Sequence, residues 1–218
     1  MQPLPPRAAL PPEAMLARAR AMREELQQRR TVRHFSDRPV AREVIEEAIR
    51  AAGTAPSGAN RQPWHFVAIS DPRIKRAIRV AAEHEEKALY EGRISEEWRE
   101  ALAPLGTDWH KPYLEIVPWI VVVFEQTHSL APDGTPRKNY YVKESVGIAC
   151  GLFITALHTM GLATLTHTPS PMNFLKELLR RPDNERPFLL IPMGFPAEGC
   201  FVPDLRRKSL DQVMVVHK

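Results

Sequence analysis

Apolar side chains recur every three or four residues in several parts of the chain, which is the spacing of one helix face. This pattern predicts a helix that begins at Pro12, a second at about Ala41–Ala52, and a charged helical region at about Asp71–Glu91. The longest pattern, Tyr140–Met160, is apolar all round, which is typical of a central helix or of one in a subunit interface. A shorter helix is expected at Pro171–Arg181.

Short apolar runs between these helices predict strands at Trp64–Ile69, Leu162–Thr168 and Phe188–Gly194. Val117–Phe124 is continuously apolar and rich in β-branched residues, so we expect a strand that is covered on both faces. At the end of the chain, Val213–Val216 predicts a strand that pairs elsewhere, on a partner subunit. Helices therefore alternate with single strands, and the class is α/β or α+β around one sheet.

The 218 residues are most simply one domain, with a flexible arm rich in proline and alanine at residues 1–12 and a folded unit at residues 13–218. The net charge of +4 comes from interleaved acidic and basic residues, which favours small anionic ligands over nucleic acid. The longest apolar run is too short to cross a bilayer, and the first residues lack a signal-peptide pattern. Neither cysteine lies in a CxxC motif and the histidines are scattered, so no metal site is indicated. We expect a cytoplasmic protein that binds neither membrane nor nucleic acid.

A loop of small and polar residues joins a helix to a strand within Ala51–Ile69. Ser57, Gly58 and Ala59 at its centre allow the backbone to approach a ligand closely. The loop is therefore a candidate site for an anion or a planar ring, and an ordinary connecting loop is the alternative interpretation.

Three arginines fall within five residues where the first predicted helix ends: Arg29, Arg30 and Arg33. In an extended segment, Arg29, Thr31 and Arg33 point the same way, and a guanidinium group binds phosphate through two hydrogen bonds. A phosphate site is one interpretation of this segment, and a solvated charged surface is the other.

Glu86 and Tyr90 stand four residues apart on a predicted helix, so both side chains leave the same face. The next stretch, Gly92–Gly106, is polar and broken by glycine and proline, which suits a mobile lid over about residues 83–111. Taken alone, Glu86, Tyr90 and Lys111 are better explained as a solvated surface with a half-buried tyrosine. The sequence contains no dinucleotide-binding glycine motif, P-loop or serine-hydrolase elbow.

Four stretches resemble the FMN-dependent nitroreductase superfamily, and most closely its members that dehalogenate halotyrosines. These stretches are Arg29–Arg33, Thr54–Trp64, Tyr140–Gly151 and Pro203–Asp211, and the similarity extends over about Leu26–Val216. The resemblance implies a nitroreductase-like α/β (α+β) fold, with a central mixed, mainly antiparallel sheet flanked by helices. It also implies a domain-swapped homodimer with C-terminal strand exchange and two FMN sites built from both subunits.

The same resemblance implies which residues hold FMN. Thr168 would donate its hydroxyl group to flavin N5, which favours one-electron chemistry. Ser57, Thr166 and His167 would contact the flavin through backbone or side-chain groups. The residues implied for the phosphate and the ribityl chain are Arg29, Arg30, Thr31, Arg33 and Arg207.

A lid that binds an amino-acid zwitterion distinguishes the halotyrosine-dehalogenating members, and its acid, phenol and amine match Glu86, Tyr90 and Lys111. Glu86 would pair with the ammonium group, while Lys111 and Tyr90 would bind the carboxylate. The Ala59 N–H group would donate to the substrate phenolate. The resemblance thus implies a flavin-dependent oxidoreductase that uses reduced FMN to convert iodotyrosine to tyrosine plus halide. NAD(P)H or a flavin reductase system would be the external electron donor.

Two alternative functions remain open. A broad-specificity FMN nitroreductase or quinone reductase would have little affinity for zwitterions, and a non-catalytic flavin-binding protein would not turn over. Thr31 and His167 stand where the animal members have serine and threonine, and Pro171–Phe174 differs from the family's corresponding stretch. The resemblance therefore implies least about the wall of the site near residues 171–174.

Overall fold

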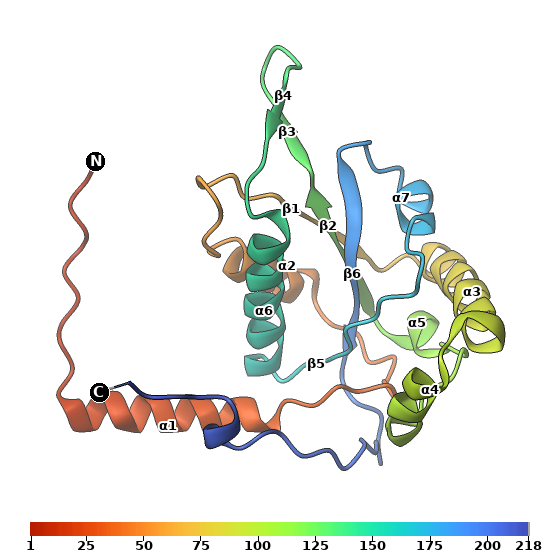
Figure 1. The fold of residues 1–218 in the computed structure, drawn as a ribbon, viewed down its shortest axis with the longest axis horizontal. Coiled ribbons are helices and arrows are strands. Elements are labelled where there is room, and N and C mark those ends of the chain that lie inside the picture. Colours follow the sequence, from red (N-terminus) through yellow and green to blue (C-terminus); the bar gives the residue numbers. More distant parts are fainter. Residues whose placement is uncertain (218) are drawn as a thin grey trace.

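A four-stranded antiparallel sheet forms the centre of the structure, a computed structural model that describes residues 1–217 (Figure 1). The strand order is β1 (Trp64–Ile69), β2 (Trp119–Gln126), β6 (Glu185–Gly194) and β5 (Ala163–Thr164). All three pairings are antiparallel, and a bulge between Val123 and Phe124 shifts the register of β2 against β6. The mainly antiparallel central sheet that the family resemblance implied is confirmed.

Helices α2 (Arg42–Ala52) and α6 (Val142–Thr159) cover one face of the sheet. Ile45 of α2 and Phe153 of α6 are fully buried there, in the same apolar cluster as Val121 of β2. The apolar positions that predicted α2 therefore face the sheet because their helical spacing places them on one side.

Helices α3 (Pro72–Ala88), α5 (Tyr113–Ile116) and α7 (Phe174–Leu178) cover the other face. The cluster on this face contains Ile120, Val122 and Phe124 of β2, which alternate with the residues that face α2 and α6. All residues in β2 from 120 to 124 are completely buried, which confirms the prediction of a strand covered on both faces.

The boundaries of α6 follow from backbone geometry at its two ends. The helix begins at Val142, two residues later than predicted, because Tyr141 has left-handed backbone angles with φ of 48°. It ends at Thr159, and Gly161 follows with φ of 78°, a conformation that glycine adopts without strain.

Several elements lie outside the central layers, including short 3₁₀ helices at Ala103–Leu105 and Leu210–Gln212. α1 (Pro12–Gln28) follows an N-terminal segment without regular structure. A wide turn at Leu89–Arg93 extends α3, and α4 (Glu96–Leu102) follows within the predicted lid. A hairpin of β3 (His128–Leu130) and β4 (Pro136–Lys138) projects from the end of β2 (Figure 1).

One predicted strand and one predicted helix are shorter in the structure than expected, and a second predicted strand is unpaired within the described residues. In Leu162–Thr168 only β5 joins the ladder, although His167 forms an isolated bridge with Leu190. Val213–Val216 has no strand pairing within the described residues, so exchange of this strand with a second subunit stays a prediction. The predicted helix at residues 171–181 is regular only over α7.

The apolar stripe of α1 stays largely exposed within the described residues. None of its residues is buried, and Met22 is 60% exposed. The C-terminal tail runs beside α1, where Arg207 donates hydrogen bonds to the Gln27 and Arg29 carbonyl groups (Figure 1). Within residues 1–217, no helix combines the length and apolar character that a membrane span requires.

Candidate functional site

The arginine-rich segment after α1 lies along the edge of the sheet. Thr31 forms a parallel bridge with Thr164 of β5, and the Val32 N–H donates to the Thr164 carbonyl at 3.2 Å. Val32 is buried whereas Thr31 and Arg33 are half-buried, which is the alternation expected of an extended segment. The segment therefore turns Thr31 and Arg33 to the same side, as the sequence predicted.

Arginine side chains surround a hollow of about 250 Å³ beside this segment. The C-terminal tail closes it, and Arg30 donates a hydrogen bond to the Pro203 carbonyl. No acidic residue is among those that line it: Arg29, Arg30, Thr31, Arg33, Leu105, Pro203, Leu205, Arg206 and Arg207.

The charges of this hollow favour an anionic ligand. Burial lowers the pKa of Arg29, and the nearby positive charges of Arg207 and Arg30 lower it further. Mutual repulsion among guanidinium groups is relieved when a multiply charged anion binds between them. The predicted phosphate residues thus come together in one chain, and the donor set fits the phosphate group of FMN.

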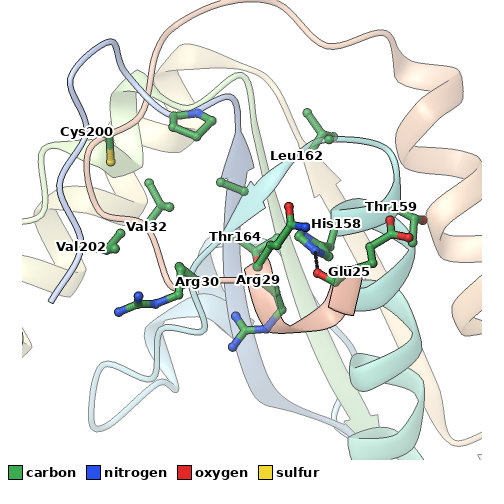
Figure 2. Close-up of a pocket in the computed structure, with 14 residues that line it drawn as sticks. Glu25, Arg29, Arg30, Val32, His158, Thr159, Leu162, Thr164, Cys200 and Val202 are labelled. Atoms are coloured by element: carbon green, nitrogen blue, oxygen red, sulfur yellow. Dashed lines mark hydrogen bonds between the residues drawn. The ribbon is translucent and has the colours of Figure 1, made fainter. Parts of the chain in front are cut away.

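A second, larger hollow of about 510 Å³ adjoins the first and shares Arg29 and Arg30 with it (Figure 2). It lies between the end of α1, the end of α6 and the chain after β6. His158 Nε2 contacts the Glu25 carbonyl at 2.8 Å and holds these two helix ends together. No residue predicted for substrate binding lines this hollow.

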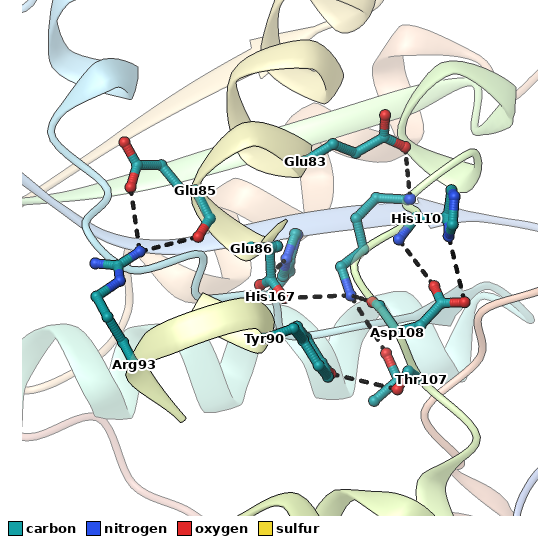
Figure 3. A network of polar contacts seen from close by, with 10 residues as sticks. Glu83, Glu85, Glu86, Tyr90, Arg93, Thr107, Asp108, His110 and His167 are labelled. Atoms are coloured by element: carbon teal, nitrogen blue, oxygen red, sulfur yellow. Dashed lines mark hydrogen bonds and ion pairs between the residues drawn. The ribbon is translucent and has the colours of Figure 1, made fainter. Parts of the chain in front are cut away.

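The predicted lid residues form a buried polar cluster (Figure 3). Lys111 Nζ lies 3.4 Å from Glu86 Oε2, and His167 Nε2 lies 3.1 Å from Glu86 Oε1. Lys111 also donates to Thr107 Oγ1 at 3.3 Å, and the Tyr90 hydroxyl donates to the Thr107 carbonyl at 3.3 Å. The three predicted zwitterion residues therefore meet in one place.

Residues that sequence reasoning missed hold this cluster in position. Glu83 lies one turn before Glu86 on α3 and accepts hydrogen bonds from the Lys111 N–H at 2.7 Å and from Arg79 Nε at 2.8 Å. Lys111 also donates to the Asp108 carbonyl. The spacing of Glu83 and Glu86, three residues apart on one helix, was a signal for their shared face. The sequence gave no comparable signal for Thr107 or Asp108.

The electrostatics of the cluster keep Glu86 ionised. Burial by itself raises the pKa of Glu86, but the hydrogen bond from His167 and the charge of Lys111 together hold it below its ordinary value. Burial lowers the pKa of Lys111, and the negative charge of Glu86 opposes that shift. Burial likewise lowers the pKa of His167, against the opposing hydrogen bond to Glu86. The cluster is therefore a buried ion pair beside a neutral imidazole at pH 7.

A small hollow of about 140 Å³ connects the lid cluster to the threonines after β5. Glu86, Tyr90 and Lys111 line it together with Thr166 and Thr168. Arg33 lines both this hollow and the arginine-rich one, so the predicted substrate and cofactor residues surround adjoining spaces.

Ser57 and Ala59 lie apart from all these residues. Their loop is fixed to the beginning of α6, because Gly58 forms a bridge with Tyr140 and its N–H contacts Ser145 Oγ at 3.4 Å. Thr164, in contrast, follows the far end of the same helix. A helix of 18 residues is about 27 Å long, so one chain does not bring the two halves of the predicted site together (Figure 1).

Close packing explains why the loop requires glycine at position 58. A Cβ atom there would lie 2.6 Å from the Tyr140 carbonyl oxygen. Ala59 follows with φ of 50° and is exposed, and no hydrogen bond from its N–H is found within residues 1–217. The Ser57 hydroxyl accepts a hydrogen bond from the Gln62 N–H at 2.9 Å. The loop thus presents backbone groups at its surface.

The sequence matches known families and relatives over most of its length. A family model described as "Nitroreductase family" matches residues 26–195. An iodotyrosine deiodinase of Haliscomenobacter hydrossis is 59% identical over 210 residues, which cover 96% of this chain and 95% of that protein. Iodotyrosine deiodinase 1 of Homo sapiens is 43% identical over 206 residues, which cover 94% of this chain and 71% of that protein.

Solved structures agree with the sequence comparisons. A crystal structure of oxidized iodotyrosine deiodinase bound to FMN and 3-iodo-L-tyrosine matches with a TM-score of 0.79 and 28% identity, covering 90% of this chain and 98% of that one. A BluB-like flavoprotein of Clostridium difficile shares the fold, with a TM-score of 0.68 and 20% identity over 90% of this chain and 99% of that one. The chain therefore belongs to the nitroreductase family, and within it to the iodotyrosine deiodinases.

Proposed function

We propose that this protein is an FMN-dependent oxidoreductase that removes halide reductively from halotyrosines and converts iodotyrosine to tyrosine plus halide. The observation that carries the proposal is the buried pair of Glu86 and Lys111, which lines the same hollow as Thr168 in a member of the iodotyrosine deiodinases. A general nitroreductase has no need for two opposite charges held at this position.

The buried pair is suited to an amino-acid zwitterion. Glu86 pairs with the substrate ammonium, and Lys111 and the Tyr90 hydroxyl bind its carboxylate. Before the substrate arrives, Glu86 and Lys111 neutralise each other at 3.4 Å. Binding therefore exchanges one ion pair for two and leaves no buried charge without a partner, which is the costly case.

FMN is the cofactor that the arginine-rich hollow accommodates. Arg29, Arg30, Arg33 and Arg207 would hold its phosphate, and Thr166 and Thr168 would contact its ring system, with the Thr168 hydroxyl as the donor to N5. When bound, reduced FMN supplies the electrons that replace the carbon–halogen bond by a carbon–hydrogen bond. NAD(P)H or a flavin reductase system is the proposed external donor, since each turnover consumes two electrons.

A homodimer completes the site in this proposal. Ser57 and Ala59 of a second subunit contribute the flavin contact and the N–H donor to the substrate phenolate, because one chain keeps them at the far end of α6. Exposed apolar side chains on α1, α6 and the tail support such an interface, and exchange of the C-terminal strand extends it. They include Met15, Leu16, Met22, Ile148, Leu152, Val213 and Val215.

We place the protein in the cytoplasm. Cys150 and Cys200 are both free thiols, and burial raises the pKa of Cys150 to about 12, which makes it unreactive. Free cysteines without a disulfide partner are typical of a reducing compartment.

One anaerobic experiment tests the proposed reaction. The FMN-loaded protein is reduced with dithionite, freed of excess reductant and mixed with 3-iodotyrosine, and flavin absorbance, tyrosine and iodide are followed. We expect reoxidation of the flavin with one tyrosine and one iodide per flavin. A flavin that stays reduced with 3-iodotyrosine but is reoxidised by a nitroarene would contradict the proposal in favour of a general nitroreductase.

A further inference from the structure

His167 is joined to the substrate lid and not only to the strand that carries it. Its backbone N–H and C=O groups pair with Leu190 at 2.8 and 3.0 Å, which fixes the residue in the sheet. Its side chain is buried and reaches Glu86 Oε1 of α3 at 3.1 Å (Figure 3). A residue from the flavin side of the site is therefore in direct contact with the proposed ammonium-binding carboxylate.

The neighbours of His167 in sequence point the other way. Thr166 and Thr168 are exposed while His167 is 7% exposed, as expected for alternating side chains in an extended segment. The threonine hydroxyl groups are therefore available to a cofactor at the surface, whereas the imidazole is turned toward the interior. Both backbone groups of His167 already form hydrogen bonds, so only its side chain can act in the site, through its contact with Glu86.

We infer that His167 is a positioning residue that orients the Glu86 carboxylate for the ammonium group of the substrate, and that its protonation weakens substrate binding. This inference rests on the proposed function and adds to it a second residue that sets substrate affinity.

The geometry explains how the imidazole orients Glu86. The Nε2–H donates to Oε1, while Oε2 faces Lys111 at 3.4 Å. The terminal torsion of a glutamate side chain is broad, so a carboxylate that loses one of these contacts samples several orientations. Both contacts fix the carboxylate plane before the substrate binds, and the His167 contact still holds Oε1 when Lys111 turns to the substrate carboxylate.

The charges around His167 explain its sensitivity to protons. Glu86 of α3 favours the protonated imidazole, whereas Lys111 before α5 and Arg33 after α1 disfavour it. Tyr113 of α5 presents its ring edge-on at 6.1 Å and stays uncharged, because burial raises its pKa far above neutrality. Protonation of His167 would place two positive charges against Glu86 and leave it a weak partner for a third, the substrate ammonium.

The Nδ1 atom adds a second reason to regard this imidazole as functional. It is buried and has no hydrogen-bond partner within the described residues. A buried ring nitrogen without a hydrogen-bond partner lowers the stability of the fold. If His167 only packed, an apolar side chain would fill the same space without this loss. The contact with Glu86 is the one polar interaction that its side chain makes within residues 1–217.

Two variants separate the positioning role from a packing role. His167→Ala removes the donor, whereas His167→Gln keeps an amide N–H near the position of Nε2 and cannot be protonated. The dissociation constants of 3-iodotyrosine and of 2-iodophenol, which lacks the amino-acid group, are measured by quenching of flavin fluorescence in the FMN-loaded protein. Each titration is repeated between pH 5.5 and 8.

We expect His167→Ala to weaken 3-iodotyrosine binding by about tenfold or more, the loss expected for a hydrogen bond to a charged group, with less than a twofold change for 2-iodophenol. His167→Gln should bind 3-iodotyrosine within about threefold of wild type at pH 8 and should lose the weakening at acid pH that wild type shows once its lowered imidazole pKa is passed. In a double-mutant cycle, Glu86→Gln should abolish the effect of His167→Ala.

Three outcomes overturn the inference. Equal losses for both ligands in His167→Ala would show a packing role, and an unchanged acid limb in His167→Gln would show that another group titrates. Wild-type protein that binds FMN but not 3-iodotyrosine would overturn the proposed function and this inference together. FMN content and the melting temperature are recorded for each variant, and if His167→Ala does not fold, the pH profile of His167→Gln decides the question.

Discussion

The lid and the small-residue loop carry residues predicted for one site, yet their surroundings differ. In the lid, Glu86 and Lys111 are buried within a single chain and satisfy each other. In the loop, Ala59 is exposed, and its segment is fixed to the N-terminal end of α6, away from β5. The lid therefore contributes paired charges inside the fold, whereas the loop contributes unpaired backbone groups at the surface.

This difference shows which part of the site a single chain can stabilise. Buried charges are tolerated only with partners, so the lid must be nearly complete before substrate binds. An unpaired backbone N–H group at the surface hardly lowers stability, because water forms its hydrogen bond. The loop is therefore stable in a single chain before a second subunit binds. The lid is therefore expected to set substrate affinity, and the loop to link activity to dimer formation.

The largest expected effect comes from breaking the proposed interface. Met22→Glu places a charge in the exposed apolar stripe of α1, so we expect the dimer to dissociate into monomers. The monomers would lack the flavin contacts from the partner's loop, and we expect FMN affinity to fall by about 100-fold or more, which corresponds to about 2.7 kcal/mol. Sedimentation measures the oligomeric state, and flavin absorbance measures FMN binding. Ala17→Glu adds the same charge on another face of α1 and is the control. A Met22→Glu protein that remains dimeric would exclude α1 from the interface.

Loss of charge in the lid should have the next largest effect. Glu86→Gln leaves Lys111 without its partner and removes the contact to the ammonium, so we expect 3-iodotyrosine to bind more weakly by about 2 kcal/mol, or about 30-fold. FMN affinity should stay within about twofold. Glu85→Gln, on the neighbouring half-buried acid that pairs with Arg93, is the control. Titration calorimetry compares the two, and equal affinities would remove Glu86 from the substrate site.

A smaller effect should follow from displacing the loop. Gly58→Ala forces a Cβ atom to within 2.6 Å of the Tyr140 carbonyl oxygen, and overpacking of this kind destabilises a protein by about 1–3 kcal/mol. Urea unfolding of the FMN-free protein gives the free energy of unfolding. Gly92→Ala introduces the same side chain where no atom lies within 4 Å and should cost little. If both variants unfold alike, the contact with Tyr140 is unimportant.

The smallest effect concerns acid stability of the lid. Because the pKa of His167 is lowered by burial, the unfolded chain takes up its proton first, so stability is full above the ordinary value of 6.5 and falls as the pH drops below it. Glu86, whose folded pKa is also lowered, adds a further loss only below about pH 4.5. We expect the melting temperature to fall as the pH drops along this first limb. In His167→Gln the limb near pH 6.5 should be absent.

Much of the fold was predictable because its signals are local. The strand Trp64–Ile69 and the helix over Ala41–Ala52 follow from the spacing of apolar residues, and the structure reproduces both within one residue. The strand expected at Leu162–Thr168 was predicted too long, since alternation of side chains persists after the ladder ends. The tail Val213–Val216 has strand composition but pairs with no strand among residues 1–217.

The sequence by itself determined the main helices and the central strands, and through its resemblance to the family it implied Glu86, Tyr90 and Lys111 as candidate site residues. These features depend on residue type and on spacing along one element. Only the tertiary structure decided that His167 contacts Glu86, 81 residues earlier in the chain, and that Ser57 and Ala59 lie apart from Thr168. Contacts between distant segments depend on how helices and strands pack, and the local spacing of apolar residues does not predict that packing.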